Sequence, residues 1–164
     1  MADQYRKLVV FYSLEGSTRR IAAAIAETAG ADQLELKPQK EINSQGFMKF
    51  VWGGSQVVTK KAPPLLPLEK NPADYDLLFI GTPVWAFSFA PALNTFFQTV
   101  RLNGKKVALF CCNDGGRGKT FENMRQALTG NEVLGEVEFI APAKRLAESE
   151  AKAKAWAETI LQSL

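Results

Sequence analysis

Three short stretches of this chain combine residue types that suit ligand binding. In the first, Ser13, Ser17 and Thr18 supply hydroxyl donors around Gly16, directly after an apolar run that ends at Tyr12. Gly16 allows the backbone to turn inward, and a helical pattern that begins at about Ser17 offers unpaired backbone N–H groups and the positive end of a helix dipole. This stretch therefore predicts an anion site.

An acidic residue, Glu15, lies inside this turn. A carboxylate aimed at a bound phosphate dianion would be strongly unfavourable in a half-buried site. We therefore expect the Glu15 side chain to face solvent or to pair with a cation such as Arg19, while its backbone N–H serves the anion. Arg19 and Arg20 lie in the first helical turn, where a cation costs about 0.3–1 kcal/mol each and a bound phosphate would offset that cost. The alternative is that the hydroxyl groups only cap the helix.

Two further stretches carry candidate binding residues. The stretch Thr82–Phe89 contains Trp85, and flat aromatic ligands are bound by apolar walls and stacking, so Trp85 is a candidate stacking residue. A core tryptophan under the following helix is the alternative, and Phe87 and Phe89 fit a core position or a lid equally well. The stretch Asn113–Gly118 is rich in glycine, which lets a ligand approach the backbone closely.

Five apolar, strand-like runs alternate with helical patterns and position these stretches. The predicted strands are Lys7–Tyr12, Gln33–Leu36, Leu77–Gly81, Lys106–Cys112 and Val133–Ile140. The predicted helices begin near Ser17, Pro91 and Ala147, with a further helix that carries Phe121, Met124 and Leu128 and a kinked helical segment that carries Phe47, Phe50 and Val51. Prolines make residues 62–76 an extended connector. The alternation predicts a parallel sheet with helices on both faces, and ligands bind such sheets at the carboxyl ends of the strands, where all three stretches lie.

The segment YSLEGSTRRIA resembles the phosphate-binding loop of the flavodoxin family, whose pattern is roughly T-x-T-G-x-T at the end of the first strand. Glu15 departs from that pattern, in a slot where many relatives carry Thr or Ser. The segment TPVW resembles the loop that borders the flavin ring, and NDGG matches the segment that contacts the pyrimidine edge of the ring. The resemblance spans essentially the whole chain. It implies an α/β fold, a flavodoxin-like three-layer α/β/α sandwich with a five-stranded parallel sheet of order 2-1-3-4-5.

The same resemblance implies FMN as the cofactor, with its phosphate held by hydroxyls and backbone amides and without an arginine. The residues implied to bind FMN are Ser13, Leu14, Glu15, Gly16, Ser17, Thr18, Thr82, Pro83, Val84, Trp85, Ala86, Asn113, Asp114, Gly115 and Gly116. Flavodoxins often cover the outer face of the ring with an aromatic residue in the third stretch, and this sequence has none there. That face is then open to a partner or substrate, or covered by Phe47, Phe50 or Trp52.

The composition excludes several classes of function. Of the 164 residues 46% are hydrophobic and 23% charged, which predicts a single domain over residues 1–164 with an ordinary core. Histidine is absent, which excludes His-based metal sites and Ser-His triads, and no metal site is predicted. The net charge of +3 and the scattered basic pairs argue against nucleic-acid binding. No apolar run is long enough to span a membrane and no secretory signal is visible, so we expect a cytoplasmic protein.

Two other motifs are weaker. The adjacent Cys111 and Cys112 would point to opposite faces of a strand, which favours buried thiols over a disulfide or a redox pair. The segment NDGGRGKT approaches a nucleotide-binding Walker loop, but Asn113 stands in place of the first glycine and no magnesium-binding Asp ends another strand.

The expected function is redox chemistry on bound FMN. A slightly basic chain favours an NAD(P)H-dependent oxidoreductase, similar to FMN reductases or quinone reductases, because positive potential attracts anionic NADPH. Such an enzyme passes electrons to a small acceptor such as a quinone or free flavin, and a homodimer is compatible with it because flavin reductases are often dimers. The alternatives are a flavodoxin-type one-electron carrier between protein partners, although carriers are typically strongly acidic, and a flavin-free fold that acts as an interaction module, for which Glu15 is the main support.

Overall fold

A computed structural model describes residues 4–40 and 62–164 of the chain. Its elements alternate between strands and helices. In chain order they are β1 (Lys7–Phe11), α1 (Ser17–Ala29), β2 (Asp32–Glu35), the 3-10 helix η2 (Pro72–Asp74), β3 (Leu77–Trp85), β4 (Ser88–Phe89), α3 (Pro91–Thr99), β5 (Lys106–Asn113), α4 (Thr120–Ala127), β6 (Glu132–Ile140), the 3-10 helix η3 (Pro142–Lys144) and α5 (Leu146–Gln162).

The sheet has the strand order β2-β1-β3-β5-β6, and all four pairings along it are parallel. Numbered among the five parallel strands alone, this is the order 2-1-3-4-5 that the flavodoxin resemblance implied. The short β4 lies off this path and pairs antiparallel with β3. The predicted α/β class and parallel sheet are confirmed.

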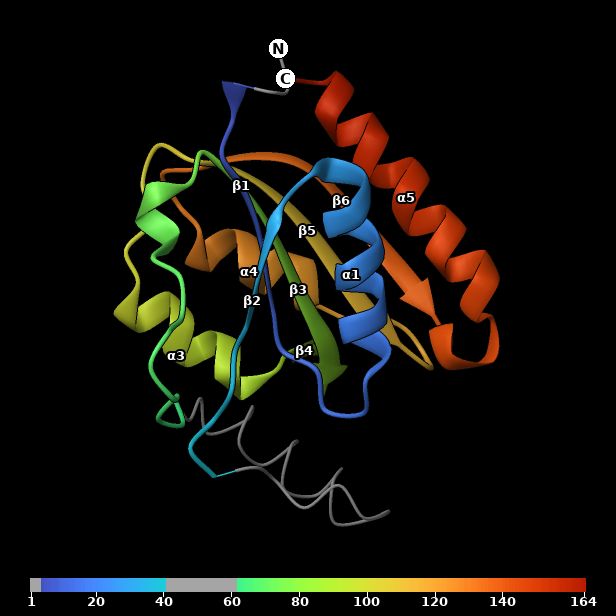
Figure 1. The fold of residues 1–164 in the computed structure, drawn as a ribbon. Coiled ribbons are helices and arrows are strands. Elements are labelled where there is room, and N and C mark those ends of the chain that lie inside the picture. Colours follow the sequence, from blue (N-terminus) through green and yellow to red (C-terminus); the bar gives the residue numbers. More distant parts are fainter. Residues whose placement is uncertain (1–3, 41–61) are drawn as a thin grey trace.

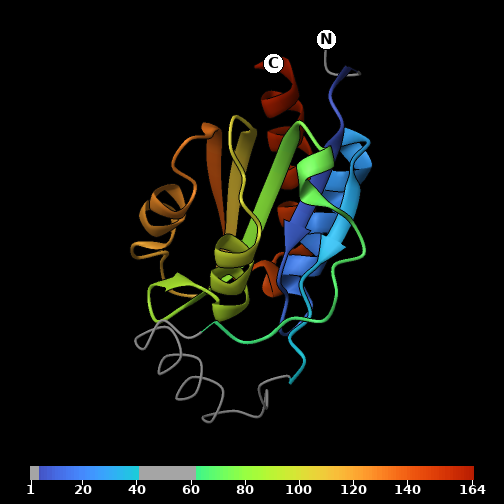
Figure 2. The same ribbon diagram turned by 90° about the vertical axis from the view of Figure 1, so that its left-hand side faces the viewer.

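Helices cover both faces of the sheet, which makes a three-layer sandwich. Helices α1 and α5 lie on one face, and α3 and α4 lie on the other (Figures 1 and 2). Strand β1 shows why the sequence requires this, because its buried side chains alternate between two cores. Leu8 and Val10 belong to the core under α3 and α4, whereas Val9 and Phe11 belong to the core under α1 and α5.

The third predicted strand is longer than expected. We predicted Leu77–Gly81, but β3 continues to Trp85. The first part of this extension pairs with β5, at Thr82↔Cys111 and Pro83↔Cys112. Its last part pairs antiparallel with β4, which turns back along it. The stretch Thr82–Phe89 is therefore a β-hairpin rather than an irregular loop.

The segment between β2 and β3 is described only in part. The connector of residues 62–76 runs alongside the chain after β2, with an isolated bridge between Pro38 and Leu65, and it ends in the short η2. The predicted helical segment that carries Phe47, Phe50 and Trp52 lies outside the described residues.

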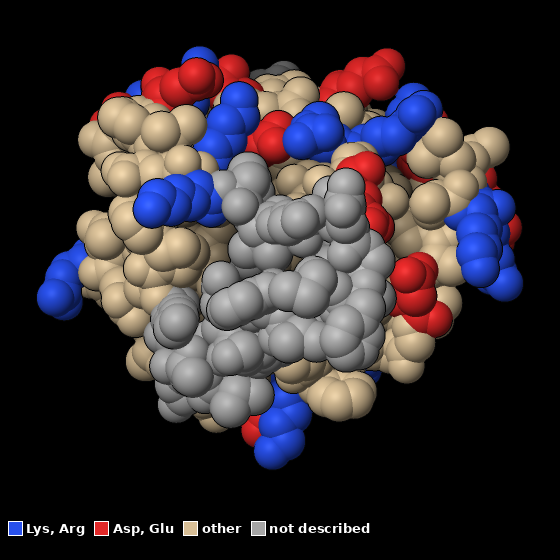
Figure 3. Space-filling view, turned by 90° about the horizontal axis from the view of Figure 1, so that it is seen from below, with Lys and Arg blue, Asp and Glu red and all other residues tan. Residues whose placement is uncertain are grey.

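The carboxyl ends of the parallel strands meet at the lower edge of the molecule in Figure 1. Strand β1 lies between β2 and β3 in the sheet, so the chain leaves β1 on one side and returns on the other. Such a switch point is where open parallel sheets bind their ligands. Figure 3 looks onto this edge, and the described part of that face carries basic and acidic side chains side by side.

Candidate functional site

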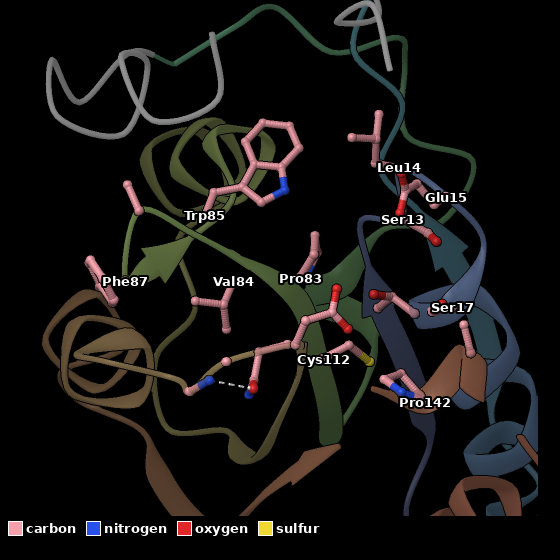
Figure 4. A pocket seen from close by; sticks show the side chains of 17 residues that line it. Ser13, Leu14, Glu15, Ser17, Pro83, Val84, Trp85, Phe87, Cys112 and Pro142 are labelled. Atoms are coloured by element: carbon pink, nitrogen blue, oxygen red, sulfur yellow. Dashed lines mark hydrogen bonds between the residues drawn. The ribbon is translucent and has the colours of Figure 1, made fainter. Parts of the chain in front are cut away.

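A cavity of about 360 Å³ opens at this edge, between the loops that follow β1, β3 and β5 (Figure 4). All the predicted site residues except two line it. These residues are Ser13, Leu14, Glu15, Ser17, Thr18, Pro83, Val84, Trp85, Ala86, Asn113, Asp114, Gly115 and Gly116. Three stretches that are far apart in the sequence therefore form one site.

The two exceptions, Gly16 and Thr82, support the walls of the cavity from behind. Gly16 precedes α1 with φ of 100°, a left-handed conformation that glycine adopts without strain. Thr82 is fully buried. Its hydroxyl donates to the Pro83 carbonyl at 2.7 Å and accepts from the Ala90 N–H at 2.9 Å, so it fastens the hairpin to the start of α3 and is not available to a ligand.

The loop between β1 and α1 leaves backbone donors available at the first turn of the helix. The Ser13 hydroxyl oxygen accepts hydrogen bonds from the N–H groups of Gly16 (3.1 Å) and Arg19 (3.2 Å), so for Ser13 the capping interpretation holds. Within residues 4–40 and 62–164, the N–H groups of Ser17 and Thr18 have no acceptor. The loop therefore caps part of the helix and keeps two donors for an anion.

The two arginines of this turn are paired with carboxylates. Arg19 donates two hydrogen bonds to Glu35 of β2, from Nε at 2.9 Å and from an Nη at 2.7 Å. Arg20 lies 3.4 Å from a carboxylate oxygen of Glu150 in α5. We expected a bound phosphate to offset the two cations, but acidic residues of neighbouring elements already do so. The Glu15 side chain is exposed.

Trp85 is half-buried and belongs to both the cavity and the core. Its ring meets Tyr12 edge-on, with ring centroids 5.7 Å apart, and Leu14 lies across the cavity from it (Figure 4). Phe89 packs on Phe97 in the core at a centroid distance of 5.3 Å. The two interpretations of Trp85, as a core residue and as a ligand contact, are therefore compatible.

The turn after β5 is held by a carboxylate from the next strand. The Asn113 side chain accepts from the Gly116 N–H at 2.8 Å and donates to Glu138 at 2.9 Å. The other oxygen of the Glu138 carboxylate accepts from Arg117 at 2.7 Å. Glu138 thus fixes both ends of the turn that carries Asp114 and the glycines.

The geometry agrees with a family comparison. A model of the family described as flavodoxin matches residues 6–160. The chain belongs to the flavodoxin family.

Individual proteins are similar to this flavodoxin-family chain in sequence or in fold. A protein named NAD(P)H dehydrogenase (quinone) from Archaeoglobus fulgidus is 26% identical over an alignment that covers 86% of this chain and 79% of that protein. The crystal structure of a flavoprotein in complex with FMN from Lactobacillus acidophilus has a TM-score of 0.72 at 21% identity. The alignment covers 87% of this chain and 99% of that protein. A candidate flavoprotein from Bacteroides eggerthii has a TM-score of 0.78 at 22% identity. The alignment covers 95% of this chain and 98% of that protein.

Four residues that line the cavity were not among the predicted site residues: Phe87, Cys112, Pro142 and Ala143. Cys112 directly precedes the third stretch, and Pro142 and Ala143 begin η3, one residue after the end of β6. The rule that ligands bind at the carboxyl edge applies to the end of β6 as it does to the other strands, so it could have found Pro142 and Ala143. Phe87 carried no signal that separates a cavity wall from a core position.

Both cysteines of this flavodoxin-family chain are free and buried. Burial raises the pKa of the Cys111 thiol to about 12, with a further contribution from the adjacent Cys112. Burial likewise raises the pKa of Cys112 to about 12, against a hydrogen bond with Thr18 that lowers it. Both thiols are therefore protonated at neutral pH, which supports the interpretation of buried structural thiols over a reactive pair.

These thiols predict a loss of stability in alkaline solution. Their ordinary pKa of 9.0 applies in the unfolded chain, so the unfolded state loses protons above pH 9 that the folded state keeps until about pH 12. The free energy of unfolding should thus fall as pH rises between these values, by about 1.4 kcal/mol per thiol at pH 10. Urea unfolding at pH 8 and pH 10, with a reductant present, measures the change.

The matched control is Cys111→Ala, measured at the same two pH values. Its free energy of unfolding should fall by about 1.4 kcal/mol less than that of the wild type, because one of the two titrating thiols is gone. Equal pH dependence in the two proteins would show that Cys111 does not titrate differently in the folded and unfolded states.

The described residues carry neither a membrane-spanning helix nor a metal cluster. None of their helices is long and apolar enough to cross a membrane. No group of three or more Cys, Asp, Glu or His side chains in the same part of the chain could hold a metal ion.

Proposed function

We propose that this flavodoxin-family chain is a flavoprotein that binds FMN in the cavity and passes electrons from a nicotinamide dinucleotide to a small acceptor such as a quinone or free flavin. The observation that carries the proposal is the chemical difference between the two ends of the cavity (Figure 4). The Ser17 hydroxyl and the available N–H groups of Ser17 and Thr18 lie at one end, and the apolar side chains of Val84 and Trp85 lie at the other end. FMN has the matching difference, with a phosphate at one end and a planar ring system at the other.

The size and charge of the cavity fit this ligand. A volume of about 360 Å³ lies within the range of small-molecule pockets, about 300–1,000 Å³. Because Arg19 and Arg20 are paired with carboxylates, the phosphate would be held by the helix N-terminus and hydroxyls rather than by guanidinium groups. The glycines of the Asn113–Gly116 turn would let the polar edge of the ring approach the backbone.

Bound FMN would supply the redox chemistry, because its ring system takes up two electrons with a proton as a hydride and passes them on. In the net reaction, NAD(P)H and one solvent proton reduce a quinone to a hydroquinone and release NAD(P)⁺. The name of the Archaeoglobus relative supports a dinucleotide donor and a quinone acceptor. The net charge of +3 supports an anionic donor, since a mildly positive chain attracts it.

An absorbance spectrum tests the cofactor and anaerobic mixing tests the reaction. The purified protein, with FMN added if it is colourless, should show a flavin absorbance spectrum. The flavin should stay with the protein when free FMN is removed on a desalting column. Rapid bleaching by NADPH or NADH without oxygen supports the oxidoreductase. Bleaching by dithionite or a reductase partner alone would instead identify a one-electron carrier, and no FMN binding under any condition would leave a flavin-free interaction module.

Replacing Glu15 by glutamine should leave the affinity for FMN unchanged or raise it by up to about fivefold. The Glu15 side chain is exposed, and removing its charge from the turn next to a bound phosphate removes a repulsion of about 0–1 kcal/mol at a solvent-screened position. Titration of the apoprotein with FMN, followed by flavin fluorescence, measures the dissociation constant. A large loss of affinity in Glu15→Gln would mean that the carboxylate itself serves the ligand and that the proposed orientation is wrong.

A further inference from the structure

Phe87 is the most exposed large hydrophobic residue among those the structure describes. Its side chain is 70% exposed, compared with 50% for Ile140 and 47% for Leu66. It lies at the tip of the hairpin between β3 and β4, and it lines the cavity at the end opposite Ser17 (Figure 4). A phenyl ring in this position contributes little to the core and enlarges the apolar wall of the site.

The backbone that presents this ring is strained. Ala86 and Phe87 have φ values of 48° and 64°, the left-handed region that favours glycine or asparagine. Two-residue hairpins with two positive φ values are normally built from Asn-Gly or Gly-Gly. Neither position of this turn carries the residue that the turn geometry favours, so the ring is kept at a cost to folding. Strain of this kind concentrates at functional sites.

The strained turn is also held by hydrogen bonds from the start of α4 and the residue before it. The Lys119 N–H donates to the Phe87 carbonyl at 2.9 Å, and the Asn123 side-chain amide donates to the Ser88 hydroxyl at 2.9 Å. Gly118 packs so closely that a side chain there would meet Phe87. The ring is therefore attached to a fixed backbone, and a ligand that contacts it does not have to order the turn first.

We propose that Phe87 forms a subsite at the outer end of the cavity for the planar, conjugated ring of a second small ligand, which donates electrons to the bound cofactor or accepts them from it. This inference rests on the proposed function, because it assumes that FMN occupies the cavity between Ser17 and Trp85. The second ring would then bind at the outer end of the cavity, where Phe87 is exposed. An aromatic face suits a flat, conjugated ligand, since stacked or edge-on ring pairs are favourable beyond the area they bury.

Two sources offer such a ring, the nicotinamide of the donor and the quinone acceptor, and separate binding measurements distinguish them. The protein loaded with FMN is titrated with a naphthoquinone in one arm and with oxidised nicotinamide dinucleotide in the other. Phe87→Ala should weaken binding in at least one arm by about tenfold, and Phe87→Tyr, which keeps the ring, should bind as the wild type does. In steady-state turnover the same ligand should show a higher KM in Phe87→Ala with a smaller change in kcat.

The matched control is Leu66→Ala, which removes another exposed apolar side chain outside the cavity and should change neither dissociation constant. Phe87→Gly serves as a second variant that relieves the turn while it removes the ring, so its thermal unfolding midpoint should not lie below that of Phe87→Ala. If FMN binds normally to Phe87→Ala and Phe87→Gly and both arms match the wild type, the subsite is wrong while the proposed function stands. If FMN does not bind to the wild type, the proposed function itself fails.

Discussion

Replacing Trp85 by alanine is expected to weaken FMN binding by about two to three orders of magnitude. Trp85 is half-buried and forms one wall of the cavity. If about 100 Å² of its indole is buried against the ring system, its loss removes about 2.5 kcal/mol. The lost ring-to-ring contact adds about 0.5–1.5 kcal/mol. Fluorescence titration of the apoprotein with FMN measures the change in dissociation constant.

Riboflavin, which lacks the phosphate, makes this experiment specific. Because Trp85 lies at the apolar end of the cavity and Ser17 at the polar end, Trp85→Ala should weaken riboflavin and FMN by the same factor. Ser17→Ala should weaken FMN more than riboflavin. A loss of affinity for FMN alone in Trp85→Ala would place the phosphate, not the ring, beside the indole.

The core role of Trp85 requires its own control. Trp85 meets Tyr12 edge-on, so the alanine variant also loses stability, and the free energy of unfolding of the apoprotein should be measured beside the affinity. Trp156→Phe is the matched variant, because Trp156 packs on Phe79 and Phe110 across the sheet from Tyr12. It should change the stability without changing FMN binding. If Trp85→Ala lowers the free energy of unfolding but weakens FMN binding by less than about threefold, Trp85 is a core residue and not a stacking residue.

The elements that local sequence determines were predictable. The continuous apolar runs of β1 and β5 indicate strands buried on both faces, and parallel strands bring their carboxyl ends to one edge. That geometric consequence placed the residues around Ser17, Trp85 and Gly115 in one cavity, although no local pattern connects them.

Features that depend on contacts between distant segments were not predictable. Arg19 and Glu35 meet because β2 pairs with β1 beside the helix, and a sequence pattern does not show that register. Glu138 supports the turn at Asn113 from a neighbouring strand for the same reason. The positive φ values of Ala86 and Phe87 contradict the preferences of their residue types, so a reading of the sequence assigns them to an ordinary loop.

The contact between Gly118 and Phe87 joins the second and third stretches. A substitution at Gly118 is therefore expected to cause a large loss of stability. Gly118 has φ of 53°, and a Cβ atom added there would lie 2.4 Å from the Phe87 Cβ and 2.9 Å from its Cα and carbonyl oxygen. Gly118→Ala should therefore lower the free energy of unfolding by about 3 kcal/mol, of which about 1–2 kcal/mol is the left-handed conformation and about 1–3 kcal/mol is the clash. Urea unfolding of the apoprotein measures the loss.

A double mutant separates the two causes, because Phe87→Gly removes the Cβ that lies nearest and adopts φ of 64° without strain. The single variant Phe87→Gly should be close to neutral, since the ring it removes is mostly exposed. Combined with Gly118→Ala, it should recover about 1 kcal/mol of the loss, and recovery stays partial because the Phe87 Cα and carbonyl oxygen remain in place. Strict additivity of the two substitutions would mean that the hairpin and the turn after β5 do not constrain each other. A non-additive result would show instead that the turn at Gly118 sets the position of the hairpin. A glycine outside the cavity would then fix the position of the Phe87 ring at the outer end of the cavity.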